Sequence, residues 1–101
     1  MWIALNNSFL SVVSHRDHPD KLLVRARIEG DIERIFAYAD VFSAPRSDYK
    51  YRAVIDRADV SSVIADLVDD IEYDDFKSSV TDQKRHDAYL KIWSIMRGMQ
   101  R

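Results

Sequence analysis

The segment LLVRARIEGDIERIF, residues 22–36, carries the strongest structural signal in the chain. In residues 22–28, successive side chains of an extended chain would point to opposite faces. One face would carry Leu22, Val24, Ala26 and Ile28, and the other would carry Leu23, Arg25 and Arg27. This period of two is typical of a half-buried strand. After Gly30, apolar residues recur at helical spacing: Ile32, Ile35, Phe36 and Ala39. The pattern predicts a strand and then a helix, for which Asp31 is the expected N-cap.

The same two patterns extend through the rest of the chain. We expect further strands at residues 2–5, 9–16, 41–42 and 49–56, and helices over residues 58–71 and from residue 81 or 82 to about 98. The segment EYDDFK, residues 72–77, is ambiguous between an edge strand and a turn. Residues 22–75 then have the ferredoxin-like order βαββαβ, preceded by a hairpin and followed by a helix. The expectation is one α+β domain over residues 1–101, with a mainly antiparallel sheet and its helices on one face.

The two long helices differ in the width of their apolar faces. The helix over 58–71 has a narrow stripe: Val60, Val63, Ile64, Leu67 and Ile71. The last helix has a wider one: Ala88, Tyr89, Ile92, Trp93, Ile95, Met96 and Met99. That width predicts packing on more than one side. The oligomeric state stays open, although exposure of Met96 and Met99 on one patch would favour a dimer.

The composition excludes several classes of protein. Hydrophobic residues make up 47% and charged residues 32%, with only two glycines and two prolines, which indicates a globular chain. The absence of cysteine excludes disulfides, thiolate metal sites and a cysteine nucleophile, and it fits a reducing compartment. The sequence has no apolar run long enough for a membrane span and no basic residue ahead of its first apolar stretch, so we expect a cytoplasmic protein.

Charge is unevenly distributed along the chain. The net charge is −2, but residues 56–75 hold one basic and eight acidic residues, whereas residues 76–101 hold six basic and two acidic residues. The chain as a whole is not basic, so bulk charge does not predict non-specific DNA binding. The acidic run is expected to be a solvated helix face, with a docking surface for a basic partner as the alternative: Asp66, Asp69, Asp70, Asp74 and Asp75.

No sequence motif points to catalysis, a cofactor or a metal. There is no glycine-rich phosphate loop, no HExxH and no serine in a nucleophile-elbow context. His15, Asp17 and His18 are residue types that bind zinc, but the chain has only one other histidine, so a solvated turn is favoured. We expect a protein without catalytic residues, and we expect no cofactor.

The best candidate site is the polar face of the predicted sheet. If the helices cover the face with Leu22, Val24, Ala53 and Ile55, the opposite face gathers four cations with a flanking aromatic residue: Arg25, Arg27, Lys50, Arg52 and Tyr49. Like charges across strands are unfavourable. Counter-charges such as Asp17, Asp20 or Glu29 are therefore expected, or else an acidic partner. The sequence favours a protein-binding module, with a nucleic-acid-binding module as the alternative and a small-molecule sensor or enzyme third.

Several sequence blocks resemble a family of small uncharacterised proteins of bacteria and phages. These are FLSVV (9–13), LLVRAR (22–27) with GDIE (30–33) and Phe36, DYKYRAVIDR (48–57), DFKSSV (75–80) and RHDAYLKIW (85–93). The resemblance covers residues 2–96, and one departure is Ala37, where the family often has proline. The resemblance carries no transferable chemistry. It implies an accessory or anti-defence protein that acts on a host or phage complex.

Overall fold

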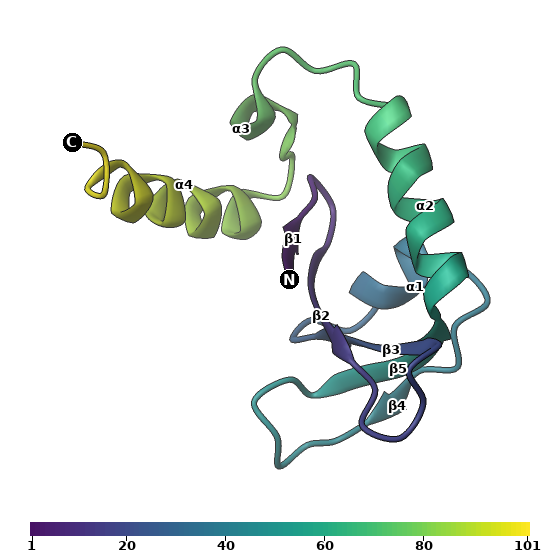
Figure 1. Ribbon diagram of the computed structural model, residues 1–101. Coiled ribbons are helices and arrows are strands. Elements are labelled where there is room, and N and C mark those ends of the chain that lie inside the picture. The colour runs from purple at the N-terminus through teal and green to yellow at the C-terminus, as the bar shows by residue number, and fades with distance from the viewer. The chain divides into compact units, whose positions relative to one another are not determined.

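The computed structural model describes residues 1–101 and contains one sheet and four helices (Figure 1). The strands are β1 (Trp2–Ala4), β2 (Phe9–Ser14), β3 (Lys21–Ala26), β4 (Phe42–Ser43) and β5 (Tyr51–Asp56). The helices are α1 (Asp31–Ile35), α2 (Arg57–Asp69), α3 (Phe76–Ser79) and α4 (Gln83–Arg97). The chain divides into two compact units: an N-terminal unit, Met1–Ile71, and a C-terminal unit, Glu72–Arg101. The sheet and the first two helices belong to the N-terminal unit, which confirms the α+β class.

The core of the N-terminal unit lies between one face of the sheet and the helices α1 and α2. Val24 and Ala53 are paired across β3 and β5, so their side chains lie on the same face. Both are buried against Ile32 of α1 and Val60 of α2. The buried cluster has these members: Leu10, Val12, Val24, Ala26, Ile32, Phe36, Ala53 and Val60. The alternation in residues 22–26 therefore predicted the core face. Ile28 lies beyond the end of β3 and is half-exposed.

The ferredoxin-like order is not confirmed by the sheet. All five strands are antiparallel to their neighbours, in the order β1-β2-β3-β5-β4. The segment expected to be the last strand, residues 72–77, lies outside the sheet, and β2 occupies the place beside β3. Two physical reasons favour β2. Aspartate is unfavourable in strands, and Asp75 instead caps α3 by accepting a hydrogen bond from the Lys77 amide at 3.2 Å.

The start of α1 differs from the expectation that Asp31 is its N-cap. Gly30 is the N-cap, with a positive φ of 92°, a conformation that glycine adopts at low cost. Asp31 is the first helical residue and is only 1% exposed. Its carboxylate accepts a hydrogen bond from the Phe9 amide at 3.0 Å and pairs with the Arg34 guanidinium at 2.6 Å. A buried, ion-paired aspartate therefore ties α1 to the start of β2.

The long helices are less buried than their apolar stripes predict. In α2, Val60 is buried and Val63 and Ile64 pack on the core, whereas Leu67 is only half-buried. The helix ends at Asp69, so Ile71, expected to belong to its apolar stripe, lies beyond it and is exposed. Within the C-terminal unit, Tyr89 of α4 stacks on Phe76 with ring centroids 5.6 Å apart. Within this unit most of the apolar residues of α4 are exposed, namely Leu90, Ile92, Trp93, Ile95 and Met96, as is Met99 beyond its end. The packing of α4 on more than one side therefore stays a prediction.

Candidate functional site

The candidate site is a row of side chains that crosses the sheet on the face that carries no helix, exposed at its two ends and largely buried at Ser11 and Arg52. The strand register pairs Trp2 with Ser11, Ser11 with Arg25, Arg25 with Arg52, and Arg52 with Phe42. Directly paired residues of antiparallel strands point to the same face, so these residues form one line across all five strands. We call this line the Arg–aromatic row: Trp2, Ser11, Arg25, Arg52 and Phe42. It lies on the face opposite α1 and α2, because its members alternate with the core residues along each strand.

The ring of Tyr49 lies under two of the arginines, Arg25 in β3 and Arg27 just after it. Its side chain is only 4% exposed, although it precedes β5 in the chain. The Arg25 guanidinium lies 4.6 Å from the centroid of the Tyr49 ring and the Arg27 guanidinium lies 4.1 Å from it, both in range of a cation–π interaction. The aromatic residue that the sequence placed at the flank of the site is therefore a buried platform for two of the cations.

Hydrogen bonds hold the three arginines in fixed positions. Arg25 Nη2 donates to Ser11 Oγ at 2.7 Å, and Arg27 Nη1 donates to the Asp48 carbonyl oxygen at 2.6 Å. Arg52 Nε donates to the Tyr49 carbonyl oxygen at 3.1 Å, and its Nη2 forms an ion pair with Asp48 at 3.4 Å. Arg25 Nε is buried and has no hydrogen-bond partner. The arginines are thus preorganised, and the buried Nε of Arg25 is a donor without a partner in the protein.

The counter-charge differs from the ones that the sequence suggested. Asp17, Asp20 and Glu29 form no ion pair with the arginines, and Asp48 takes that role. Because the Asp48 side chain is 68% exposed, its ion pair is worth at most about 1 kcal/mol. Lys50 stands apart from the cluster. It precedes β5, and its ammonium lies 5.6 Å from the centroid of the Tyr51 ring. Tyr51 packs against the core, on the other face of the sheet from the arginines.

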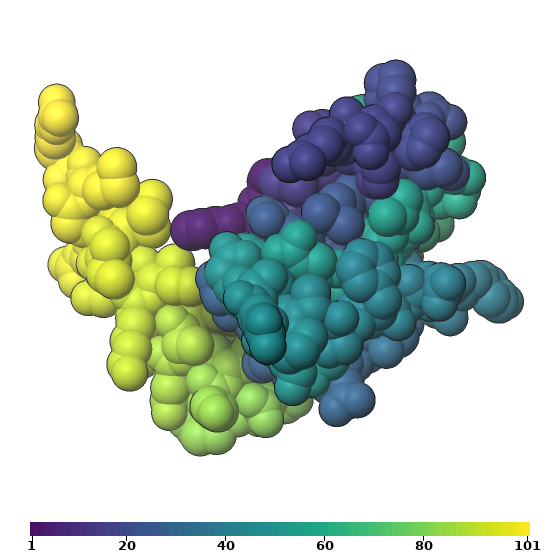
Figure 2. All heavy atoms as spheres, turned by 90° about the horizontal axis from the view of Figure 1, so that it is seen from below, coloured from purple at the N-terminus to yellow at the C-terminus, as the bar shows by residue number.

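The open face also carries apolar side chains that the sequence analysis did not assign to the site. Trp2 and Phe42, at the two ends of the Arg–aromatic row, are 74% and 48% exposed. A second row beside it is aliphatic, because Val13 pairs with Leu23 and Leu23 pairs with Val54. Figure 2, a view from below, shows atoms of the β4–β5 region in teal beside the blue to purple atoms of the earlier strands. Only the strand register could have shown that these residues line up with the arginines.

The acidic surface expected from the sequence is split between the two units. Asp66, Asp69 and Asp70 are exposed at the end of α2, where no basic residue lies in the last turn, so they face the negative end of the helix dipole. Asp74 and Asp75 belong to the C-terminal unit. Asp75 caps α3, and the hydroxyl of Ser78, which donates to its carboxylate at 2.7 Å, lowers the pKa of Asp75. The acidic run is therefore shared between the two units, and Asp75 has a separate role as a helix cap.

The histidines near β2 have a local role. His15 Nδ1 accepts hydrogen bonds from the amides of Asp17 and His18, at 3.1 and 3.2 Å, so this ring organises the turn between β2 and β3. No group of three or more histidine, aspartate or glutamate side chains is placed to hold a metal ion. None of the helices has the length and hydropathy that crossing a membrane would require.

Comparisons of this chain with models of protein families, with curated proteins and with solved structures find no match.

Proposed function

We propose that this protein is a non-catalytic binding module that docks a protein partner on the Arg–aromatic row. The observation that supports the proposal is the alignment of two arginines with exposed Trp2 and Phe42 in one line across the sheet. Tryptophan, tyrosine and arginine are the residues that dominate the binding energy of protein interfaces. An exposed apolar patch on a small protein is also a recognised mark of an interaction surface.

The chemistry of the partner follows from what the row offers. The guanidinium groups of Arg25 and Arg52 are held in place before binding, so little side-chain entropy is lost when they meet a carboxylate. Trp2 and Phe42 require an apolar surface on either side of that carboxylate. The expected partner surface is therefore an acidic centre with apolar flanks. The resemblance to bacterial and phage proteins suggests a host or phage complex as its source, and an accessory or anti-defence role.

Binding to nucleic acid is the competing hypothesis, and the geometry favours it less. Phosphate binding relies on many accessible cations. Here the face offers three arginines, Arg25, Arg27 and Arg52, and the carboxylate of Asp48 lies beside one of them. This number is smaller than the roughly 6–10 phosphate contacts of a typical nucleic-acid site. Exposed aliphatic groups such as Val54 on the same face also fit a protein surface better than a phosphate backbone.

The experiment is affinity capture of partners from a native extract, with and without nuclease treatment. The test variant is Arg25→Ser with Arg52→Ser, and the matched control is Lys84→Ser with Lys91→Ser, which removes two exposed cations from α4. We expect a captured protein that survives nuclease, is retained by the control and falls at least about tenfold with the test variant. Equal capture by both variants would overturn the proposal. Loss of capture after nuclease, with steep weakening by salt, would establish nucleic-acid binding instead.

A further inference from the structure

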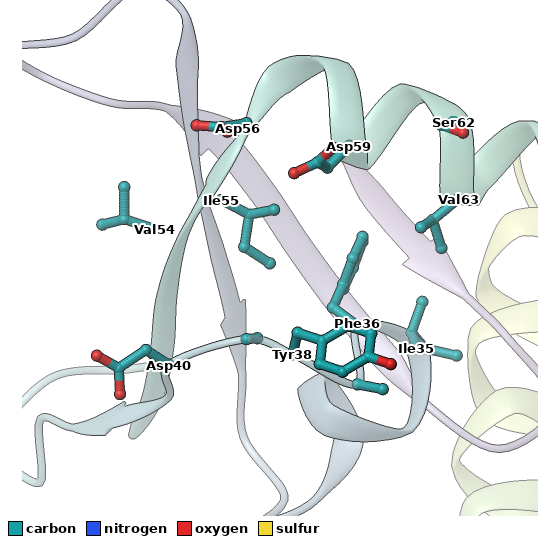
Figure 3. A pocket seen from close by; sticks show the side chains of 12 residues that line it. Ile35, Phe36, Tyr38, Asp40, Val54, Ile55, Asp56, Asp59, Ser62 and Val63 are labelled. Carbon is teal, nitrogen blue, oxygen red and sulfur yellow. The ribbon is translucent and has the colours of Figure 1, made fainter.

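A second candidate site lies on the N-terminal unit, beside the end of β5. A cleft of about 640 Å³ is bounded by the loop that follows α1, by residues 54–56 of β5 and by the first turns of α2. Its floor is apolar: Ile35, Phe36, Ile55 and Val63. Figure 3 shows Ile55 pointing into the cleft and Val54 pointing to the other side of the strand. The volume is within the usual range for ligand pockets.

The wall formed by β5 is an unpaired strand edge. The neighbouring strand β4 reaches only Tyr51 and Arg52 of β5. The Ala44 amide donates to the Lys50 carbonyl oxygen at 2.7 Å in the same register. Hydrogen bonding alternates along an antiparallel pair, so Arg52 and Val54 also direct their backbone groups to the β4 side. The Arg57 amide donates to Asp20 on the β3 side, which agrees with this alternation.

Val54 therefore presents a backbone N–H and C=O where β4 no longer runs. The structure shows no hydrogen bond to either group on that side. Natural proteins usually cover or blunt such edges, because an exposed edge pairs with other chains. Here the edge opens onto the cleft, so a strand added at this place would direct every second side chain towards the apolar floor.

The rim of the cleft is negatively charged. Asp40, Asp56 and Asp59 line it. Asp56 forms an ion pair with Lys21, and the hydrogen bond between them raises the pKa of Lys21. Asp40 and Asp59 have no ion pair, and Figure 3 places their carboxylates on different sides of the opening. The Lys21 ammonium also interacts electrostatically with Asp59. Two carboxylates without an ion pair beside an apolar floor are complementary to cations that flank an apolar side chain.

We infer that this cleft binds a short extended peptide segment of a partner protein, in which an apolar residue lies between lysines or arginines. The segment pairs with the backbone of Val54, its apolar side chain contacts Phe36, Ile55 and Val63, and its cations meet Asp40 and Asp59. The site uses the backbone edge of β5 rather than the Arg–aromatic row, so it stands or falls separately from the function proposed above.

The test is an NMR titration of the full-length ¹⁵N-labelled protein with the peptide acetyl-KVKVK-amide. We expect shifts of the amide signals of Val54, Asp56 and Asp59, and slower hydrogen exchange at the Val54 amide. The charge-reversed peptide acetyl-EVEVE-amide is expected not to bind. A peptide in which the central lysine is N-methylated keeps every side chain but loses the backbone donor of the residue that pairs with Val54, so it is expected to bind at least about tenfold more weakly.

Two protein variants distinguish binding of the peptide in this cleft from non-specific attraction of a cationic peptide to acidic residues. Asp40→Asn with Asp59→Asn is expected to weaken binding by about tenfold, since two charge pairs are lost. Asp66→Asn with Asp69→Asn removes the same charge from the exposed part of α2 and is expected to leave binding unchanged. Equal binding of the N-methylated peptide, equal weakening by both variants, or shifts confined to other residues would each overturn the inference.

Discussion

The hydrogen bond between Arg25 and Ser11 is expected to hold the Arg–aromatic row together, and a double-mutant cycle measures it. Ser11 is only 1% exposed, and Arg25 Nη2 donates to its hydroxyl at 2.7 Å. Arg25→Met leaves that buried hydroxyl without its partner, which costs about 1–3 kcal/mol. The change also removes a cation–π contact with Tyr49, worth about 0.5–1 kcal/mol, and relieves repulsion by Arg52 of similar size. The last two effects nearly cancel.

The cycle therefore has a defined outcome. Arg25→Met in the wild-type background is expected to lower the free energy of unfolding by about 1–3 kcal/mol, whereas in the Ser11→Ala background the same change is expected to cost under about 0.5 kcal/mol. Urea unfolding, followed by the amide signal intensities of Val24 and Ala53, reports on the N-terminal unit alone. A coupling energy below about 0.5 kcal/mol would show that Arg25 is not held by Ser11 and that the row is not preorganised.

Three further predictions concern local structure. Asp31→Ala removes the acceptor of the Phe9 amide, so thermal unfolding should show a loss of about 2–4 kcal/mol; a loss under about 1 kcal/mol would contradict its buried role. Gly30→Ala should cost about 1–2 kcal/mol in urea unfolding because φ is positive there, and a neutral result would exclude that conformation. The hydroxyl of Ser78 lowers the pKa of Asp75 in the folded protein. The cap of α3 is therefore fully formed above the pKa that Asp75 has in the unfolded chain, and it is lost as the pH falls through the lower pKa of the folded state. Ser78→Ala should raise the pKa of Asp75 in an NMR titration of its carboxyl carbon, and an unchanged pKa would refute the cap.

Short-range patterns were enough to predict the class and the two faces of the sheet. The alternation around Val24 and the helical spacing around Val60 depend on residues within a few positions of each other, and burial of one face is the simplest way to satisfy them. For the same reason Arg25 and Arg52 were correctly placed on one side of neighbouring strands.

The choice of neighbouring strands depends on competition between segments that are distant in sequence, and no local sequence pattern predicts its outcome. The apolar strand β2 takes the place beside β3 because the alternative segment, residues 72–77, contains aspartates that are poor in strands, one of which instead caps a helix. The register that follows from this pairing brings Trp2 to the end of the row, lines it up through Ser11 with Arg25 and places Arg52 beside Phe42. Residues from five separate strands form one surface only when the whole sheet has formed, because pairs such as Ser11–Arg25 and Arg25–Arg52 join strands that no local sequence pattern links.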